Sequence, residues 1–101
     1  MSQARRELRF TVIWILEASR GGPMRARILT ILRRQPSNPH QLARELGVNY
    51  RTVLHHLRVL EENGLVERLG QGYGRPYVLT IEAEQAWSII ENSIKRVLGD
   101  R

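Results

Sequence analysis

The 101-residue chain contains no cysteine, which excludes disulfide bonds, thiolate metal ligands and a cysteine nucleophile. Long apolar runs are also missing: the longest, residues 10–16, spans seven residues with Thr11 inside it, and is too short to cross a bilayer. No phosphate-binding glycine loop, metal-ligand cluster or isolated pair of carboxylates stands out. We therefore expect neither an enzyme nor a bound metal or cofactor, and we predict no membrane association.

Acidic residues are scarce relative to basic ones, with 10 Asp and Glu against 16 Lys and Arg, which leaves a net charge of +6. Residues 1–34 hold eight Arg and two Glu, whereas residues 35–64 are neutral overall. A compact basic chain is expected to have polyanionic partners, and nucleic acid is favoured over a membrane surface. The expected location is cytoplasmic and nucleoid-associated.

Glycine and proline divide the chain into short elements without repeats or linkers, which predicts one domain over residues 1–101. A first helix is predicted from Gln3 to Ser19, and its apolar residues surround most of the helix axis. After Gly21-Gly22-Pro23, a second helix, Met24–Arg34, has a basic side formed by Arg25, Arg27, Arg33 and Arg34.

A helix-turn-helix is predicted next. Asn38 is a suitable N-cap, with Pro39 at the first helical position and Gln41 completing a capping box. That helix ends at Gly47, and Asn49 caps a second helix over residues 50–62.

Beyond this pair, strands at residues 65–69 and 75–79 flank a loop, residues 70–74, that contains three glycines, as in a β-hairpin. Thr80 then caps a predicted helix over residues 81–98. The predicted fold class is mainly α with a small β-hairpin.

The segment from Asn38 to Val66 resembles the winged helix-turn-helix regulators of the ArsR and MarR type, and residues 21–32 look like their small archaeal members. The pattern T-V-x-x-H-L-x-x-L-E-x-x-G-L-V is matched at Thr52, Val53, His56, Leu57, Leu60, Glu61, Gly64, Leu65 and Val66. The resemblance implies a winged helix-turn-helix core over residues 24–80. An N-terminal helix within residues 1–20 and a C-terminal helix over residues 81–98 are then expected to form a homodimer.

On a helical wheel, residues 50–62 separate an apolar side from a polar side that faces outward. A polar recognition helix suits the major groove, and Arg75 in the hairpin loop suits a narrow minor groove. His40 and Gln41 lie at a helix N-terminus, which favours phosphate, although capping competes for Gln41. The residues expected to contact double-stranded DNA are Asn49, Tyr50, Arg51, Thr52, His55, Arg58, Tyr73, Arg75, His40 and Gln41.

Two neighbouring positions on the recognition helix are interpreted separately. His56 lies toward the apolar side and is interpreted as a packed structural histidine. Leu54 lies at the edge of that side, where related regulators commonly carry a small polar residue; it belongs either to the core or to a contact with a thymine methyl group.

Apolar residues of the last helix recur with coiled-coil spacing, and the winged core is already complete before Thr80. We therefore expect the last helix and the apolar excess of the first helix to pair with a second copy of the chain. The residues expected at this interface are Leu8, Val12, Ile15, Trp14, Trp87, Ile90, Ile94 and Val97.

The function hypothesis is a dimeric, sequence-specific transcriptional regulator whose recognition helix, residues 50–62, reads the major groove. Two alternatives remain open: an architectural, chromatin-like protein with little sequence preference, and a winged-helix protein-interaction module. The sequence leaves open whether an effector ligand exists.

Overall fold

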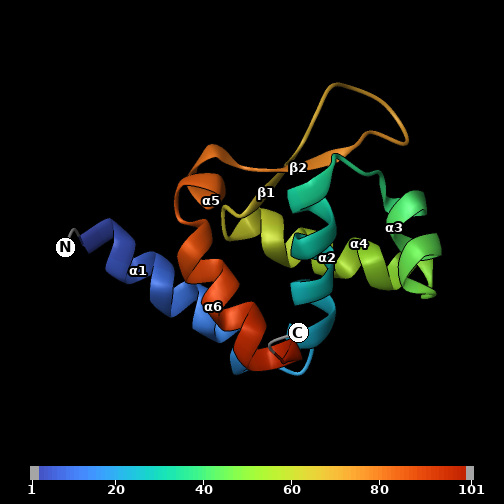
Figure 1. Cartoon of the computed structure of the whole chain (residues 1–101). Helices are drawn as coiled ribbons and strands as arrows, with labels where there is room; N and C mark the ends of the chain where they lie inside the picture. The colour runs from blue at the N-terminus through green and yellow to red at the C-terminus, as the bar shows by residue number, and fades with distance from the viewer. Residues whose placement is uncertain (1–2, 100–101) are drawn as a thin grey trace.

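The computed structural model describes residues 3–99 of the chain. It confirms the predicted fold class, because helices dominate and the two strands form a single antiparallel hairpin (Figure 1). In chain order the elements are α1 (Gln3–Val12), η1 (Ile13–Glu17), α2 (Gly22–Arg34), α3 (Pro39–Leu46), α4 (Tyr50–Glu62), β1 (Val66–Arg68), β2 (Tyr77–Leu79), α5 (Ile81–Gln85) and α6 (Trp87–Leu98).

The helix-turn-helix, α3 and α4, begins and ends where the capping residues predict. The Asn38 side chain accepts from the backbone N–H of Gln41, and the Gln41 side chain accepts from the backbone N–H of Asn38. Gly47 ends α3 in the left-handed region at φ 67°, which a side chain would disfavour. The Asn49 side chain accepts from the Arg51 amide and starts α4.

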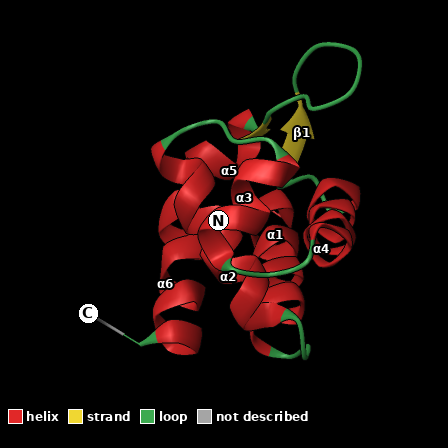
Figure 2. Cartoon of the chain, turned by 90° about the vertical axis from the view of Figure 1, so that its right-hand side faces the viewer, coloured by secondary structure: helices red, strands yellow, loops and turns green. Residues whose placement is uncertain are grey.

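The hairpin forms a wing that projects beyond the helices (Figure 2). Val66 pairs with Leu79 and Arg68 with Tyr77, so both strands are shorter than predicted. Ser37, in the loop before α3, forms an additional bridge to Tyr77 through two backbone hydrogen bonds of 2.8 and 3.2 Å. A one-residue bridge has no periodicity, so sequence patterns did not reveal this link between the wing and the helix-turn-helix.

The first helix ends two residues earlier than predicted. α1 continues into the π-helical turn η1, and the amide of Ala18 donates to the carbonyl of Ile13. α2 then begins at Gly22, where a Cβ atom would lie 2.0 Å from the carbonyl oxygen of Leu16. Only glycine fits this sharp turn.

The predicted C-terminal helix is not continuous, and this prediction was wrong. It breaks at Ala86, whose dihedral angles of −105° and 22° depart from helical values. The break allows α5 to pack against β2 while α6 packs along α1, η1 and α2, positions that one straight helix could not occupy (Figure 1).

The contact between α6 and the first helix corrects the prediction that both need a partner chain for burial. Val12, Ile15 and Ile90 are at most 2% exposed within the single chain, and Ile94 is 9% exposed. Val12, Ile15 and Ile90 therefore offer almost no accessible surface to a second copy.

Across residues 3–99, no helix has the length and apolar character needed to cross a membrane.

Candidate nucleic-acid interface

The inner face of α4 is held by a buried polar network. His56 is 7% exposed, and its Nδ1 lies 3.0 Å from Nη1 of Arg25 on α2. The Arg25 guanidinium also donates to the carbonyl oxygen of Ile15, at 3.2 Å from Nε and 3.0 Å from Nη2. That carbonyl lies in the last turn of η1, where helices leave carbonyl groups without internal donors. Arg25 thus joins η1 to the recognition helix.

This network corrects one interpretation of the sequence and confirms another. Arg25 is only 5% exposed, so it is a core residue and not part of a solvated basic side. His56 is the packed histidine that was predicted. Because Arg25 donates, Nδ1 of His56 accepts, and the neutral ring carries its proton on Nε2. Burial, and then the positive charges of Arg25 and His55, lower the pKa of His56 to about 4.

The outer face of α4 carries exposed polar side chains. Arg51, Thr52, His55 and Arg58 are all exposed, as the helical wheel predicts. Among residues 3–99, the guanidinium of Arg51 forms no ion pair. A shallow hollow on this face is lined by Tyr50, Arg51, Leu54, His55 and Arg58. The fold therefore leaves these donors available to an external partner.

Aromatic side chains connect the helix-turn-helix to the wing. The His40 ring on α3 stacks on Tyr50 at the start of α4, with ring centroids 4.3 Å apart and planes inclined by 20°. Nε2 of His40 is hydrogen-bonded to the hydroxyl of Tyr73 in the wing loop. Partial burial, followed by the interaction with Tyr73, raises the pKa of the Tyr50 hydroxyl. Three residues predicted separately to contact DNA thus form one cluster.

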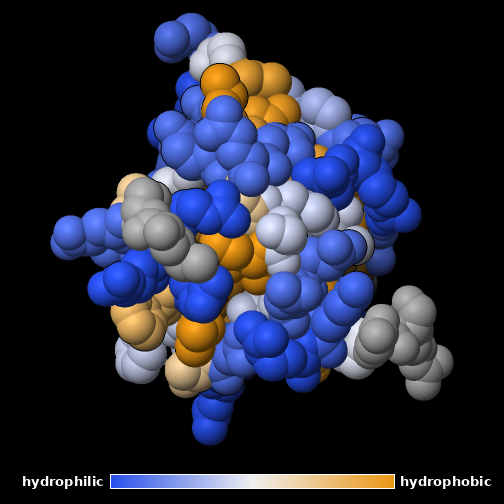
Figure 3. Space-filling view, turned by 60° about the vertical axis from the view of Figure 1, so that its left-hand side comes forward, coloured by the Kyte–Doolittle hydropathy of each residue, from blue (hydrophilic) through white to orange (hydrophobic). Residues whose placement is uncertain are grey.

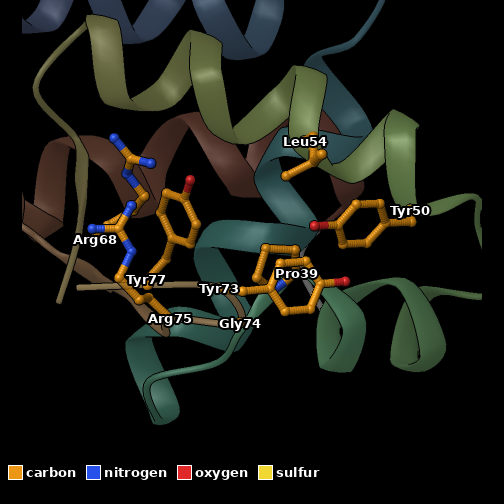
Figure 4. Close-up of a pocket in the computed structure, with 9 residues that line it drawn as sticks. Pro39, Tyr50, Leu54, Arg68, Tyr73, Gly74, Arg75 and Tyr77 are labelled. Atoms are coloured by element: carbon orange, nitrogen blue, oxygen red, sulfur yellow. The ribbon is translucent and has the colours of Figure 1, made fainter. Parts of the chain in front are cut away.

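The cluster borders a cavity of about 140 Å³ between the wing and the two helices, and Figure 4 shows Tyr50, Leu54, Tyr73 and Tyr77 around it. Arg68 and Arg75 also line this cavity. Nη1 of Arg75 donates a hydrogen bond of 2.8 Å to the carbonyl oxygen of Gly70, which holds the two ends of the loop together. Nε of Arg68 forms an ion pair with Oε2 of Glu61 at 3.3 Å.

Two of the predicted contact residues already perform structural tasks. The amide oxygen of Asn49 caps α4, and that of Gln41 completes the capping box of α3. Their NH2 groups remain as donors, since each cap uses only the oxygen.

An exposed apolar surface lies on the first helix, away from the helix-turn-helix. Phe10 is 65% exposed and Trp14 is 68% exposed. Figure 3 shows hydrophobic side chains interrupting the hydrophilic surface on this side of the molecule. Phe10 was not among the residues expected at the dimer interface, although its exposed ring lies one turn before Trp14.

The other predicted interface residues contribute less surface. Leu8, Trp87 and Val97 are half-buried and pack against the core. The ring of Trp87 lies under the guanidinium of Arg33, 4.9 Å from the ring centroid, and Arg33 also pairs with Glu84 at 2.6 Å. These contacts brace the junction between α5 and α6.

In the part of the chain that the structure describes, no three acidic or histidine side chains gather in a way that could hold a metal ion.

Comparison with known proteins agrees with this architecture. Residues 22–68 match the family described as bacterial regulatory protein, arsR family. An HTH-type transcriptional regulator of Methanocaldococcus jannaschii is 49% identical over 45 residues, which cover 45% of this chain and 47% of that protein. The chain thus matches about half the length of this curated relative.

Solved structures extend the similarity over almost the whole chain. Reduced HlyU from Vibrio cholerae has a TM-score of 0.67 at 20% identity, covering 96% of both chains. ZitR from Lactococcus lactis, solved in complex with DNA, has a TM-score of 0.60 at 19% identity, covering 97% of this chain and 79% of that one.

The fold is that of the winged helix-turn-helix proteins, and it is similar to the solved structures of HlyU and of MarR from E. coli. Residues 22–68 of the chain are thus similar to the arsR family. The matched family is described as one of bacterial regulatory proteins.

Proposed function

We propose that the chain is a dimeric, sequence-specific DNA-binding transcriptional regulator. The observation that carries the proposal is the outer face of α4, where Arg51, His55 and Arg58 are exposed on a helix whose other face is anchored in the core. An α-helix fits the major groove, and Arg is a strong donor to guanine N7 and O6. The DNA complex of the structural neighbour ZitR supports the same use of the fold.

Within this proposal, the wing contacts the minor groove or the backbone. Tyr73 and Arg75 lie in the loop that approaches α3 and α4, so wing and recognition helix form one continuous surface. His40, Gln41 and Asn49 stand at the helix N-termini of that surface, where backbone amides favour phosphate. Phosphate contacts then fix the orientation of α4, while contacts to base edges supply specificity.

A second copy of the chain completes the proposal. Phe10 and Trp14 expose large apolar side chains on α1 and η1, and removing such area from water favours association. Two recognition helices related by twofold symmetry would read half-sites ~34 Å apart, one turn of DNA. Sedimentation at micromolar concentration tests this part, and a purely monomeric chain would contradict it.

Selection of bound sequences from random duplex DNA at about 150 mM salt tests specificity, because this salt suppresses purely electrostatic binding. The expected result is a palindromic motif with half-sites one turn apart. Binding without a motif would instead support an architectural protein, a reading that the Arg-rich first third of the chain favours. A protein-interaction module would bind no duplex.

A further inference from the structure

Packing in the hydrophobic core does not explain why position 54 carries an apolar residue, Leu54. The buried residues Val53, Leu57 and Leu60 of α4 belong to the hydrophobic core, and the half-buried Val59 packs against it. Leu54 is half-buried too, yet it neither belongs to that core nor packs against it. The alternative that Leu54 is a core residue is therefore excluded, and its side chain is left at the polar surface.

Leu54 stands with Tyr50 between two hollows. Both residues line the cavity of about 140 Å³ beside the wing (Figure 4). Both also line the shallow hollow on the outer face of α4. Cationic side chains surround them, with Arg51 and Arg58 in the outer hollow and Arg75 in the cavity. Tyr50 and Leu54 thus form an apolar step on a basic surface.

The tyrosine half of this apolar step is held in place before any partner binds. Tyr50 stacks on His40 at 4.3 Å, His40 is in turn hydrogen-bonded to Tyr73, and the Asn49 cap fixes the start of α4. An apolar surface that is already ordered loses little conformational freedom on binding, so more of the contact energy is retained as affinity.

Among the base edges of the major groove, only thymine presents a methyl group, at C5. An apolar side chain pressed against an amino group or a carbonyl would leave that polar group without a hydrogen-bond partner. We infer that the apolar step, and Leu54 in particular, makes the recognition helix select thymine through its C5-methyl group. This inference rests on the proposed function and specifies one base that the recognition helix selects.

Replacing thymine by uracil tests the inference, because it removes only the methyl group and leaves the protein unchanged. Selections run in parallel on random libraries containing thymine or uracil should share a motif, except at one thymine position in each half-site. On the selected duplex, uracil at that position should weaken wild-type binding roughly fourfold per methyl group. Leu54→Ala should bind the two duplexes equally.

Two variants serve as controls. Leu54→Met keeps an apolar side chain and should keep most of the preference for thymine. Arg51→Ala should weaken binding but retain the methyl effect, because it leaves the apolar step intact. Since Leu54 lies outside the core, Leu54→Ala should also keep the thermal midpoint of the wild type.

Equal binding of thymine and uracil duplexes by the wild type would overturn the inference and leave the regulator proposal standing, because the motif would persist. A methyl effect that survives in Leu54→Ala would overturn the role of Leu54. If the wild type selects no motif, or binds no duplex, sequence-specific binding itself fails and base selection fails with it.

Discussion

The two faces of α4 carry neighbouring histidines with opposite properties. His56 faces inward, accepts a hydrogen bond from Arg25 and has a pKa of about 4. His55, one residue earlier, is exposed beside Arg51 and Arg58. The comparison shows that position on the helix, and not residue type, separates a polar group that stabilises the fold from one available to a ligand. Substitutions on the inner face should therefore change stability, and substitutions on the outer face should change binding.

The largest effect is expected on the inner face, from Arg25→Ala. This change removes the donor to His56 Nδ1 and two of the donors to the Ile15 carbonyl. The Ile15 carbonyl keeps the Ser19 hydroxyl as a donor, but His56 Nδ1 loses its partner. Because such a buried polar group costs about 1–3 kcal/mol, unfolding free energy should fall by up to about 3 kcal/mol. Denaturant titration at fixed protein concentration measures it. Arg27→Ala, exposed on the same helix, is the control and should stay within about 0.5 kcal/mol of the wild type.

The titration of His56 should make stability depend on pH. In the unfolded chain this histidine takes up a proton near pH 6.5, but in the folded chain only near pH 4. Unfolding free energy should therefore decrease as the pH is lowered through this window, by at most about 3 kcal/mol in total.

A variant pair isolates this effect. Glu17 also makes stability depend on pH, because a hydrogen bond from Arg96 is the main cause that lowers its pKa below the ordinary value of 4.5. Its stabilising interactions are therefore lost only at pH values below 4.5. His56→Gln should remove the pH dependence of stability above pH 4.5, whereas His55→Gln should keep most of it. An unchanged pH profile in His56→Gln would show that another group titrates.

At the exposed apolar surface, Trp14→Ala should weaken dimerisation without unfolding the chain. Buried Trp side chains are common hot spots of interfaces, so the dissociation constant should rise roughly thirtyfold. Sedimentation equilibrium measures it. Leu69→Ala, at an exposed leucine of the wing, is the control and should leave the constant unchanged. An unchanged dissociation constant in Trp14→Ala would show that Trp14 lies outside the interface.

On the proposed DNA-binding surface, Arg51→Ala and Arg75→Ala should each weaken DNA binding about tenfold, but in different ways. Arg51→Ala, like His55→Ala, should alter the preferred sequence, because the proposed complex places these side chains at the base edges. Arg75→Ala should weaken all sequences alike and reduce the salt dependence. Lys95→Ala on α6 is the control. If Arg51→Ala, His55→Ala and Arg75→Ala all weakened binding to every sequence equally, α4 and the wing would not have different roles in recognition.

The smallest effect is expected from Tyr73→Phe, which removes the hydroxyl that meets His40. Since both partners are exposed, unfolding free energy should change by less than about 0.5 kcal/mol. Amide hydrogen exchange in residues 70–75 should nevertheless become faster, roughly threefold, because the loop loses its anchor on α3. Unchanged exchange would show that the bond between Arg75 and Gly70 alone orders the wing.

Local chemistry along the sequence determined the helix-turn-helix. Asn38, Gln41, Gly47 and Asn49 set the ends of α3 and α4 through hydrogen bonds and dihedral angles that involve near neighbours only. The periodicity of apolar residues likewise separated the two faces of α4, including the inward His56. Both signals act within a few residues, so the sequence alone was enough to predict them.

Contacts between distant residues were decided only by the tertiary structure. Arg25 became a core residue because the carbonyl of Ile15 and the ring of His56 converge on it, and no spacing in the sequence reveals that meeting. The C-terminal helix broke at Ala86 because its two halves pack on different elements. Leu54 was ambiguous on a helical wheel, since a wheel does not show where the core ends; packing left it at the surface.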